Sequence, residues 1–213
     1  MPGLAASSLI FERIALPVDK FEIHLLEWIL PLENESIVAY AQRMAKLIQH
    51  ENIVLIGVSF GGVLVQEMAQ FLELRKLIII SSIKSNLEMP HRMKVINKLK
   101  VYKLMPLKLL QNIEILNRIP VSSFIRQRLK IYQKYLSIRD KIYLKWAIEQ
   151  MITWKRKEID ENVIHIHGDA DQVFPVVNIK NCIIIKGGTH IMILNKYKWF
   201  NENLPKIILA EIK

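Results

Sequence analysis

A serine between two glycines lies where an apolar run meets a helical pattern. Residues 52–57 form the run, and Gly57-Val58-Ser59-Phe60-Gly61 is centred just after it. A tight strand-to-helix turn exposes the serine hydroxyl and crowds the residues two positions before and after it, so glycine is favoured at both places. The N-terminus of the next helix adds positive potential and free N–H groups. We therefore predict Ser59 as a nucleophile, with Gly57 and Gly61 shaping its turn.

A serine hydroxyl needs a base to remove its proton before it attacks a carbonyl. We expect this base to be a histidine late in the chain, on a loop after the last strand. Gly187-Gly188-Thr189-His190 follows the apolar run at residues 182–186 and meets this expectation. The remaining histidines fall in predicted strands, at the end of a surface helix or in a basic segment, and they are His24, His50, His91, His165 and His167.

The third member of such a site is an acid that orients the histidine. Asp169 and Asp171 both follow the apolar run at residues 162–167, and either preserves the chain order Ser, Asp, His. The alternative is a metal site in which His165 and His167 act as ligands beside these carboxylates. Strand alternation places both histidines on one face but supplies no third spaced ligand, so we predict no metal.

The elements that must position these residues alternate between strand and helix. Strand-like runs occupy residues 21–28, 52–57, 76–81, 162–167 and 182–186, and helical patterns occupy residues 36–50, 61–74 and 197–212, the last interrupted at Pro205. This alternation predicts an α/β fold with a mostly parallel central sheet and helices on both faces. Residues 84–158 contain no strand-like run. We predict them to be a helical insertion into a core made of residues 1–83 and 159–213.

Composition narrows the class of protein. The 213 residues are 51% hydrophobic, enough for one domain with a buried core. Cys182 is the single cysteine, so no internal disulfide forms, and we expect a cytoplasmic protein with no signal peptide and no transmembrane segment. The net charge is +10, and residues 91–157 carry 17 lysines and arginines against three acidic residues. This excess favours an anionic or carrier-linked substrate, whereas no nucleic-acid motif is present.

These features resemble the α/β-hydrolase superfamily, specifically its small single-domain members with a helical cap. The resemblance covers nearly the whole chain. It is carried by the Gly-x-Ser-x-Gly turn at Ser59, by the pattern Gly-x-x-Asp-x-x-x-Pro through Gly168, Asp171 and Pro175, and by the loop that ends at His190. The resemblance implies Asp171, rather than its neighbour two positions earlier, as the acid.

The resemblance also implies how an oxyanion is held. One N–H comes from the residue after the nucleophile, here Phe60, and a second comes from a loop after an early strand. Met1-Pro2-Gly3-Leu4 is similar to that loop, which implies the N–H of Leu4. The early strands of the family are missing ahead of Met1, so we expect an unanchored, mobile loop and a native protein that begins further upstream. The intact mass of the natural protein tests this last expectation.

Two further expectations concern the neighbouring segments. The basic helical insertion would form a lid over the nucleophile, and residues 5–13 would form the first helix. Only 18 residues separate Asp171 from His190, fewer than the family's usual strand–helix–strand connection. We therefore expect the helix between them to be reduced to a turn at residues 176–180.

The chemistry implied is acyl transfer to water through an acyl-enzyme, with an ester or thioester as substrate. His190 accepts the proton of Ser59, Asp171 orients His190, and the N–H groups of Phe60 and Leu4 stabilise the oxyanion. This mechanism requires a small-molecule acyl substrate and no cofactor. The alternative is a non-catalytic binding or scaffold protein of the same fold with a vestigial triad, since fold alone does not decide function.

Overall fold

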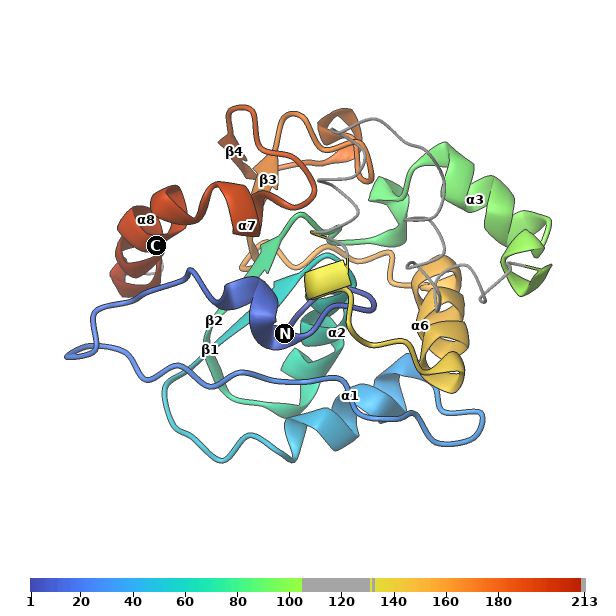
Figure 1. Ribbon diagram of the computed structural model, residues 1–213, viewed down its shortest axis with the longest axis horizontal. Helices are drawn as coiled ribbons and strands as arrows, with labels where there is room; N and C mark the ends of the chain where they lie inside the picture. Colours follow the sequence, from blue (N-terminus) through green and yellow to red (C-terminus); the bar gives the residue numbers. More distant parts are fainter. Residues whose placement is uncertain (105–130, 132, 212–213) are drawn as a thin grey trace.

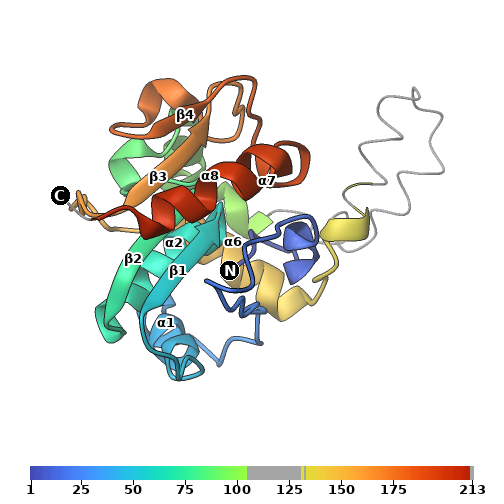
Figure 2. The same ribbon diagram turned by 90° about the vertical axis from the view of Figure 1, so that its left-hand side faces the viewer.

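A parallel β-sheet forms the centre of the molecule. The computed structural model describes residues 1–104, 131 and 133–211, and Figures 1 and 2 show it from two sides. Within these residues the sheet has the order β1-β2-β3-β4, with every neighbouring pair parallel. The strands are β1 (Ile53–Val58), β2 (Leu74–Ile80), β3 (Ile164–Gly168) and β4 (Ile183–Ile185). The predicted α/β fold class with a mostly parallel sheet is confirmed.

Helices cover both faces of this sheet (Figures 1 and 2). The α-helices are α1 (Ile37–Ala45), α2 (Phe60–Met68), α3 (His91–Lys98), α6 (Lys141–Thr153), α7 (Met192–Asn195) and α8 (Tyr197–Leu209). The short 3-10 helices are η1 (Ser8–Phe11), η2 (Ala69–Phe71), η3 (Asn86–Glu88), η4 (Val101–Leu104) and η6 (Val176–Asn178). Side chains of α1, α2 and α6 form one apolar cluster, and those of η1, α7 and α8 form a second.

Strand β2 shows why the sheet needs cover on both sides. Its successive side chains point to opposite faces, as in any strand. Leu77 and Ile79 belong to the cluster with α1 and α2, whereas Ile78 and Ile80 belong to the cluster with α7 and α8. All four are buried. The continuous apolar run in the sequence therefore reflects a strand with no solvent-facing side.

Most predicted elements form close to their expected positions. Helix α1 begins directly after Ser36, whose hydroxyl caps it by accepting a hydrogen bond from the N–H of Ala39 at 3.2 Å. The expected turn between the acid and the base is the short helix η6. Residues 5–13 contain only the single 3-10 turn η1 instead of the longer helix that the resemblance implied.

Two further predictions about secondary structure are wrong. Residues 21–28 form no strand, because they pair with no strand of the sheet and most of their side chains are exposed. Helix α8 is not interrupted at Pro205 but continues to Leu209. Its apolar face, which includes Phe200 and Leu204, is buried in the second cluster. That burial outweighs the cost of about 3 kcal/mol of a proline within a helix.

The first residues of the chain lie beside β1. The Met1 ammonium group donates a hydrogen bond to the carbonyl of Ile56 at 2.6 Å, and the Met1 carbonyl accepts one from the N–H of Val58 at 3.0 Å. Burial lowers the pKa of this ammonium group to about 5. The carbonyl of Gly3 accepts a hydrogen bond from the indole N–H of Trp28 at 2.9 Å. The expectation of an unanchored loop is therefore wrong, because both backbone and side-chain bonds hold it.

The predicted insertion at residues 84–158 is only partly described, because residues 105–130 and 132 lie outside the described part. In the remainder it contains η3, α3, η4 and α6 and no strand. Helix α6 contributes Tyr143 and Trp146 to the same cluster as α1 and α2. No helix in the described residues is long and apolar enough to span a membrane. The division into core and lid stays a prediction.

Candidate active site

Ser59 lies at the turn between β1 and α2 with an unusual backbone conformation. Its φ is 54° and its ψ is −122°, a region that residues other than glycine rarely adopt. The turn is held by a hydrogen bond from the N–H of Ser59 to the carbonyl of Ile80 at 2.9 Å. A Cβ on Gly57 would lie 2.3 Å from the carbonyl oxygen of Gly61, so glycine is required there. This strained turn exposes the Ser59 hydroxyl to the loops that follow the neighbouring strands.

The two remaining residues of the predicted triad complete a line of contacts in which His190 lies between Ser59 and Asp171. The Ser59 hydroxyl lies 2.9 Å from Nε2 of His190, and Nδ1 of His190 lies 2.9 Å from Oδ2 of Asp171. Ser59 follows β1, Asp171 follows β3 and His190 follows β4. Because the carboxyl ends of parallel strands meet at one edge of the sheet, loops far apart in the sequence bring their side chains together here.

Asp171 is held in one orientation by the backbone of its own loop. Its side chain is fully buried, and Oδ1 accepts hydrogen bonds from the N–H groups of Val173 at 2.7 Å and Phe174 at 2.9 Å. Burial alone would raise the pKa of this carboxyl group. The hydrogen bond and charge interaction with His190, together with the two backbone N–H groups, outweigh burial and lower the pKa. Asp171 is therefore ionised at neutral pH, with Oδ2 directed at His190.

Asp169 has a different position from Asp171. It is exposed, and its Oδ1 accepts a hydrogen bond from the N–H of Gly187 at 2.6 Å. Beside it the two loops touch directly, because a Cβ on Gly168 would lie 2.1 Å from the carbonyl oxygen of Gly188. Residue type and chain order fit both aspartates equally, and only the family pattern favours Asp171. The structure directs only Asp171 at the histidine, whereas Asp169 links the acid loop to the base loop.

Two buried histidines lie behind the acid loop. Nε2 of His167 donates to the carbonyl of Phe174 at 2.8 Å, so its Nδ1 accepts from Nε2 of His165 at 3.0 Å. Burial lowers the pKa of both imidazoles, that of His165 to about 2. Nε2 of His167 also lies 3.6 Å from Oδ2 of Asp171. These neutral rings use their facing nitrogens to hold the acid loop, which leaves those nitrogens engaged rather than free for a metal.

The two expected oxyanion donors belong to segments that adjoin Ser59. Phe60 is the first residue of α2, where the helix itself offers its N–H no acceptor. Gly3, which precedes Leu4, packs against the serine, and a Cβ on it would lie 3.3 Å from Cβ of Ser59. No hydrogen bond joins the N–H of Phe60 or Leu4 to another described residue. Neither N–H is therefore engaged by another described residue, which is compatible with the expected role.

Several residues that support the site were not identified from the sequence. The indole of Trp28 stacks on Phe60, with ring centroids 5.2 Å apart and planes 9° apart. The hydroxyl of Tyr143 on α6 accepts a hydrogen bond from the N–H of Ala5 at 3.3 Å. The hydroxyl of Ser82 donates to the carbonyl of Ser59 at 2.7 Å. No local pattern marks these residues, because each acts through a contact between distant segments.

Comparison with known proteins agrees with this architecture. No family model and no curated sequence matches the chain. Among solved structures, a hydrolase from Pseudomonas aeruginosa superposes with a TM-score of 0.69 at 10% identity, covering 98% of this chain and 88% of that one. A thermophilic esterase from Thermogutta terrifontis gives 0.66 at 14% identity, with coverage of 97% and 87%.

A third similar structure is the type II thioesterase from the borrelidin biosynthetic cluster. It gives a TM-score of 0.58 at 12% identity, covering 98% of this chain and 88% of that one. At such identities the likeness concerns the course of the backbone and not the substrate. The parallel sheet, the strained serine turn and these superpositions lead to one conclusion: the chain has the α/β-hydrolase fold.

Proposed function

We propose that the protein is a serine hydrolase that cleaves an ester or a thioester. Ser59 attacks the carbonyl carbon, and His190 accepts the Ser59 proton and returns it to the leaving group. The acyl-enzyme then reacts with water, which His190 activates in the same way. Asp171 stabilises the imidazolium, and the N–H groups of Phe60 and Leu4 stabilise the oxyanion.

The observation that carries this proposal is the continuous hydrogen-bonded chain from Ser59 through His190 to Asp171. Each link is 2.9 Å long, within the range at which proton transfer is possible. A vestigial site has no requirement for a strained serine, yet the backbone of Ser59 is in a costly conformation that orients its hydroxyl toward His190. The geometry thus favours catalysis over a purely binding role.

The proposed substrate class rests on the charge of residues 91–157 and on two of the similar solved structures. Residues 91–157 have an excess of 14 positive charges, which would attract an anionic or carrier-linked acyl group. Two of the similar structures are described as an esterase and a thioesterase. Both activities use the same attack on a carbonyl carbon. Nucleic acid is not proposed as a partner, and a cytoplasmic location stays a prediction.

A fluorophosphonate probe tests the proposal, because it labels only an activated serine. We expect the wild-type protein to be labelled and Ser59→Ala to be unlabelled. Ser137→Ala, which removes an exposed serine in an irregular segment, is the matched control and should label like wild type. Absence of labelling in folded wild-type protein would favour the non-catalytic alternative. A panel of chromogenic esters and acyl thioesters then separates esterase from thioesterase by kcat/KM.

A further inference from the structure

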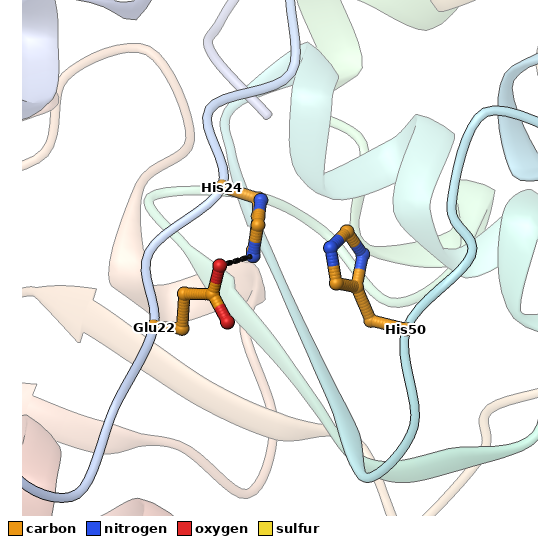
Figure 3. A group of neighbouring side chains, drawn as sticks. All are labelled: Glu22, His24 and His50. Carbon is orange, nitrogen blue, oxygen red and sulfur yellow. Dashed lines mark ion pairs between the residues drawn. The ribbon is translucent and has the colours of Figure 1, made fainter.

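Three exposed side chains with metal-binding atoms meet on a surface away from Ser59. Glu22 and His24 lie in the irregular segment before α1, and His50 lies in the turn between α1 and β1. Figure 3 shows the three side chains converging from these two segments. One ligand atom from each residue lies within 4.8 Å of the other two. Within the described part of the chain, this is the one group of three or more such residues that meets this distance.

The contacts in this group are closer than solvated side chains need. Nε2 of His24 lies 3.0 Å from Oε1 of Glu22, although the two side chains are 45% and 80% exposed. The rings of His24 and His50 have centroids 3.8 Å apart and planes 37° apart. Holding three exposed side chains together costs rotamer entropy that one exposed contact between Glu22 and His24 hardly offsets. A cation shared by all three would offset it.

The chemistry of the donors selects a class of cation. Two neutral imidazoles and one carboxylate are a usual ligand set for Zn²⁺, with a water molecule as the fourth ligand. With metal–ligand distances of about 2.0–2.1 Å, tetrahedral geometry places ligand atoms roughly 3.3 Å apart. The 3.0 Å contact already meets this separation, and rotation of the exposed His50 side chain closes the remaining distance. Hard cations such as Mg²⁺ prefer all-oxygen sites and fit less well.

We propose that Glu22, His24 and His50 form a binding site for Zn²⁺ or a similar first-row divalent ion. Bound metal would join two segments that are separated by the 25 residues between His24 and His50. The first segment leads directly to Trp28, which stacks on Phe60 and bonds Gly3. The metal would therefore fasten the segment that supports the oxyanion loop. This proposal does not depend on the hydrolase activity, because metal binding and stability are measured without substrate.

Isothermal titration of the full-length, metal-free protein with ZnCl₂ tests the site. We expect one Zn²⁺ per chain, and at least a tenfold weaker Kd in each of His24→Ala, His50→Ala and Glu22→Gln. Replacing a residue that only hydrogen-bonds to a metal ligand typically costs 10- to 100-fold in metal affinity, so loss of a ligand itself should cost no less. These exposed positions tolerate substitution, so the variants are expected to fold. His91→Ala removes an exposed histidine outside the group and is the matched control.

Thermal unfolding gives a second readout. Zinc at a hundredfold excess over the wild-type Kd should raise the Tm of wild type and of His91→Ala by roughly 5–10 °C, and that of His50→Ala by no more than about half as much. Replacement by Co²⁺ should give the visible absorption of a four-coordinate ion in wild type and not in His50→Ala. The proposal is overturned if wild type binds no zinc, or if His24→Ala and His50→Ala bind it with wild-type affinity.

Discussion

Trp28 links the segment before α1 to the oxyanion loop, so its replacement by phenylalanine is an informative change. Its side chain is buried, its ring stacks on Phe60, and its N–H donates to the carbonyl of Gly3 at 2.9 Å. Trp28→Phe keeps an aromatic ring against Phe60 but removes the donor. The segment Gly3-Leu4 then loses the side-chain bond that fixes it beside Ser59.

The structure sets the size of the expected effects. A neutral hydrogen bond contributes about 1 kcal/mol to stability. The Gly3 carbonyl keeps its bond from the N–H of Ala6 at 3.1 Å, so it is not left unsatisfied. A decrease in Tm of about 2–4 °C therefore follows for a chain of this size. Loss of an oxyanion donor typically costs 10²–10³ in kcat. Trp28 only positions that donor, so we expect kcat to fall by about 10- to 100-fold.

Steady-state kinetics on a chromogenic ester, with Tm measured alongside, separates the two effects. An oxyanion donor acts mainly in the transition state, so kcat should fall while KM changes little. Trp146→Phe is the matched control, because Trp146 is equally buried and donates its N–H to the carbonyl of Glu35 at 2.7 Å. It should lose similar stability and keep kcat. A folded Trp28→Phe with wild-type kcat, or equal losses of kcat in both variants, would refute the reasoning.

Three other changes have defined outcomes. Asp171→Asn should reduce kcat/KM by about 10⁴-fold. Because Oδ1 accepts hydrogen bonds from two backbone N–H groups, the new amide NH₂ must face His190 and impose the wrong tautomer of its ring. Retention of a tenth of the activity would contradict this. Burial lowers the pKa of His165 to about 2, below its unfolded value of about 6.5, so the unfolded state binds more protons between these values. The free energy of unfolding should therefore fall by about 1.4 kcal/mol per pH unit below about pH 6.5. His165→Phe should flatten this dependence in urea titrations between pH 4.5 and 6.5. Equal pH dependence of the free energy of unfolding in wild type and variant would contradict this role of His165. Gly168→Ala should lower Tm and activity together. The alanine Cβ would lie 2.1 Å from the carbonyl oxygen of Gly188 and push apart the loops that carry Asp171 and His190. Unchanged kinetics would show that the active site does not need this contact.

Local sequence predicts much of the fold, because strands that are buried on both faces leave a continuous apolar run in the sequence. The apolar, β-branched residues 76–81 give nearly the same strand in sequence and structure, since no solvent-facing side interrupts the run. Residues 21–28 have equally suitable residue types but form no strand, because a strand requires a partner edge. The backbone of Met1 already bonds the edge of β1 near Val58. Propensity within a segment does not reveal whether such an edge is free.

The residues of the candidate site also divide into those that local sequence reveals and those that it does not. Ser59 and His190 are visible in the sequence, because the glycines that each tight loop requires lie within a few residues of them. The choice between Asp169 and Asp171 is not local, since it depends on which carboxylate faces a histidine from another loop. In the structure, Asp171 contacts His190, whereas Asp169 bonds the N–H of Gly187. For the same reason, the positions of His165 and His167 in a strand do not reveal that they hold the loop of Asp171.

The sequence by itself determined the four strands of the sheet, the tight serine turn after the first of them, and the need for a histidine and an aspartate beside Ser59. These features arise from backbone sterics and from side-chain periodicity, which act over a few neighbouring residues. Only the tertiary structure decided that Trp28 supports Gly3 and that His50 lies beside Glu22 and His24. Such contacts join segments far apart in the chain, and their geometry is set by how helices pack on the sheet rather than by any local pattern.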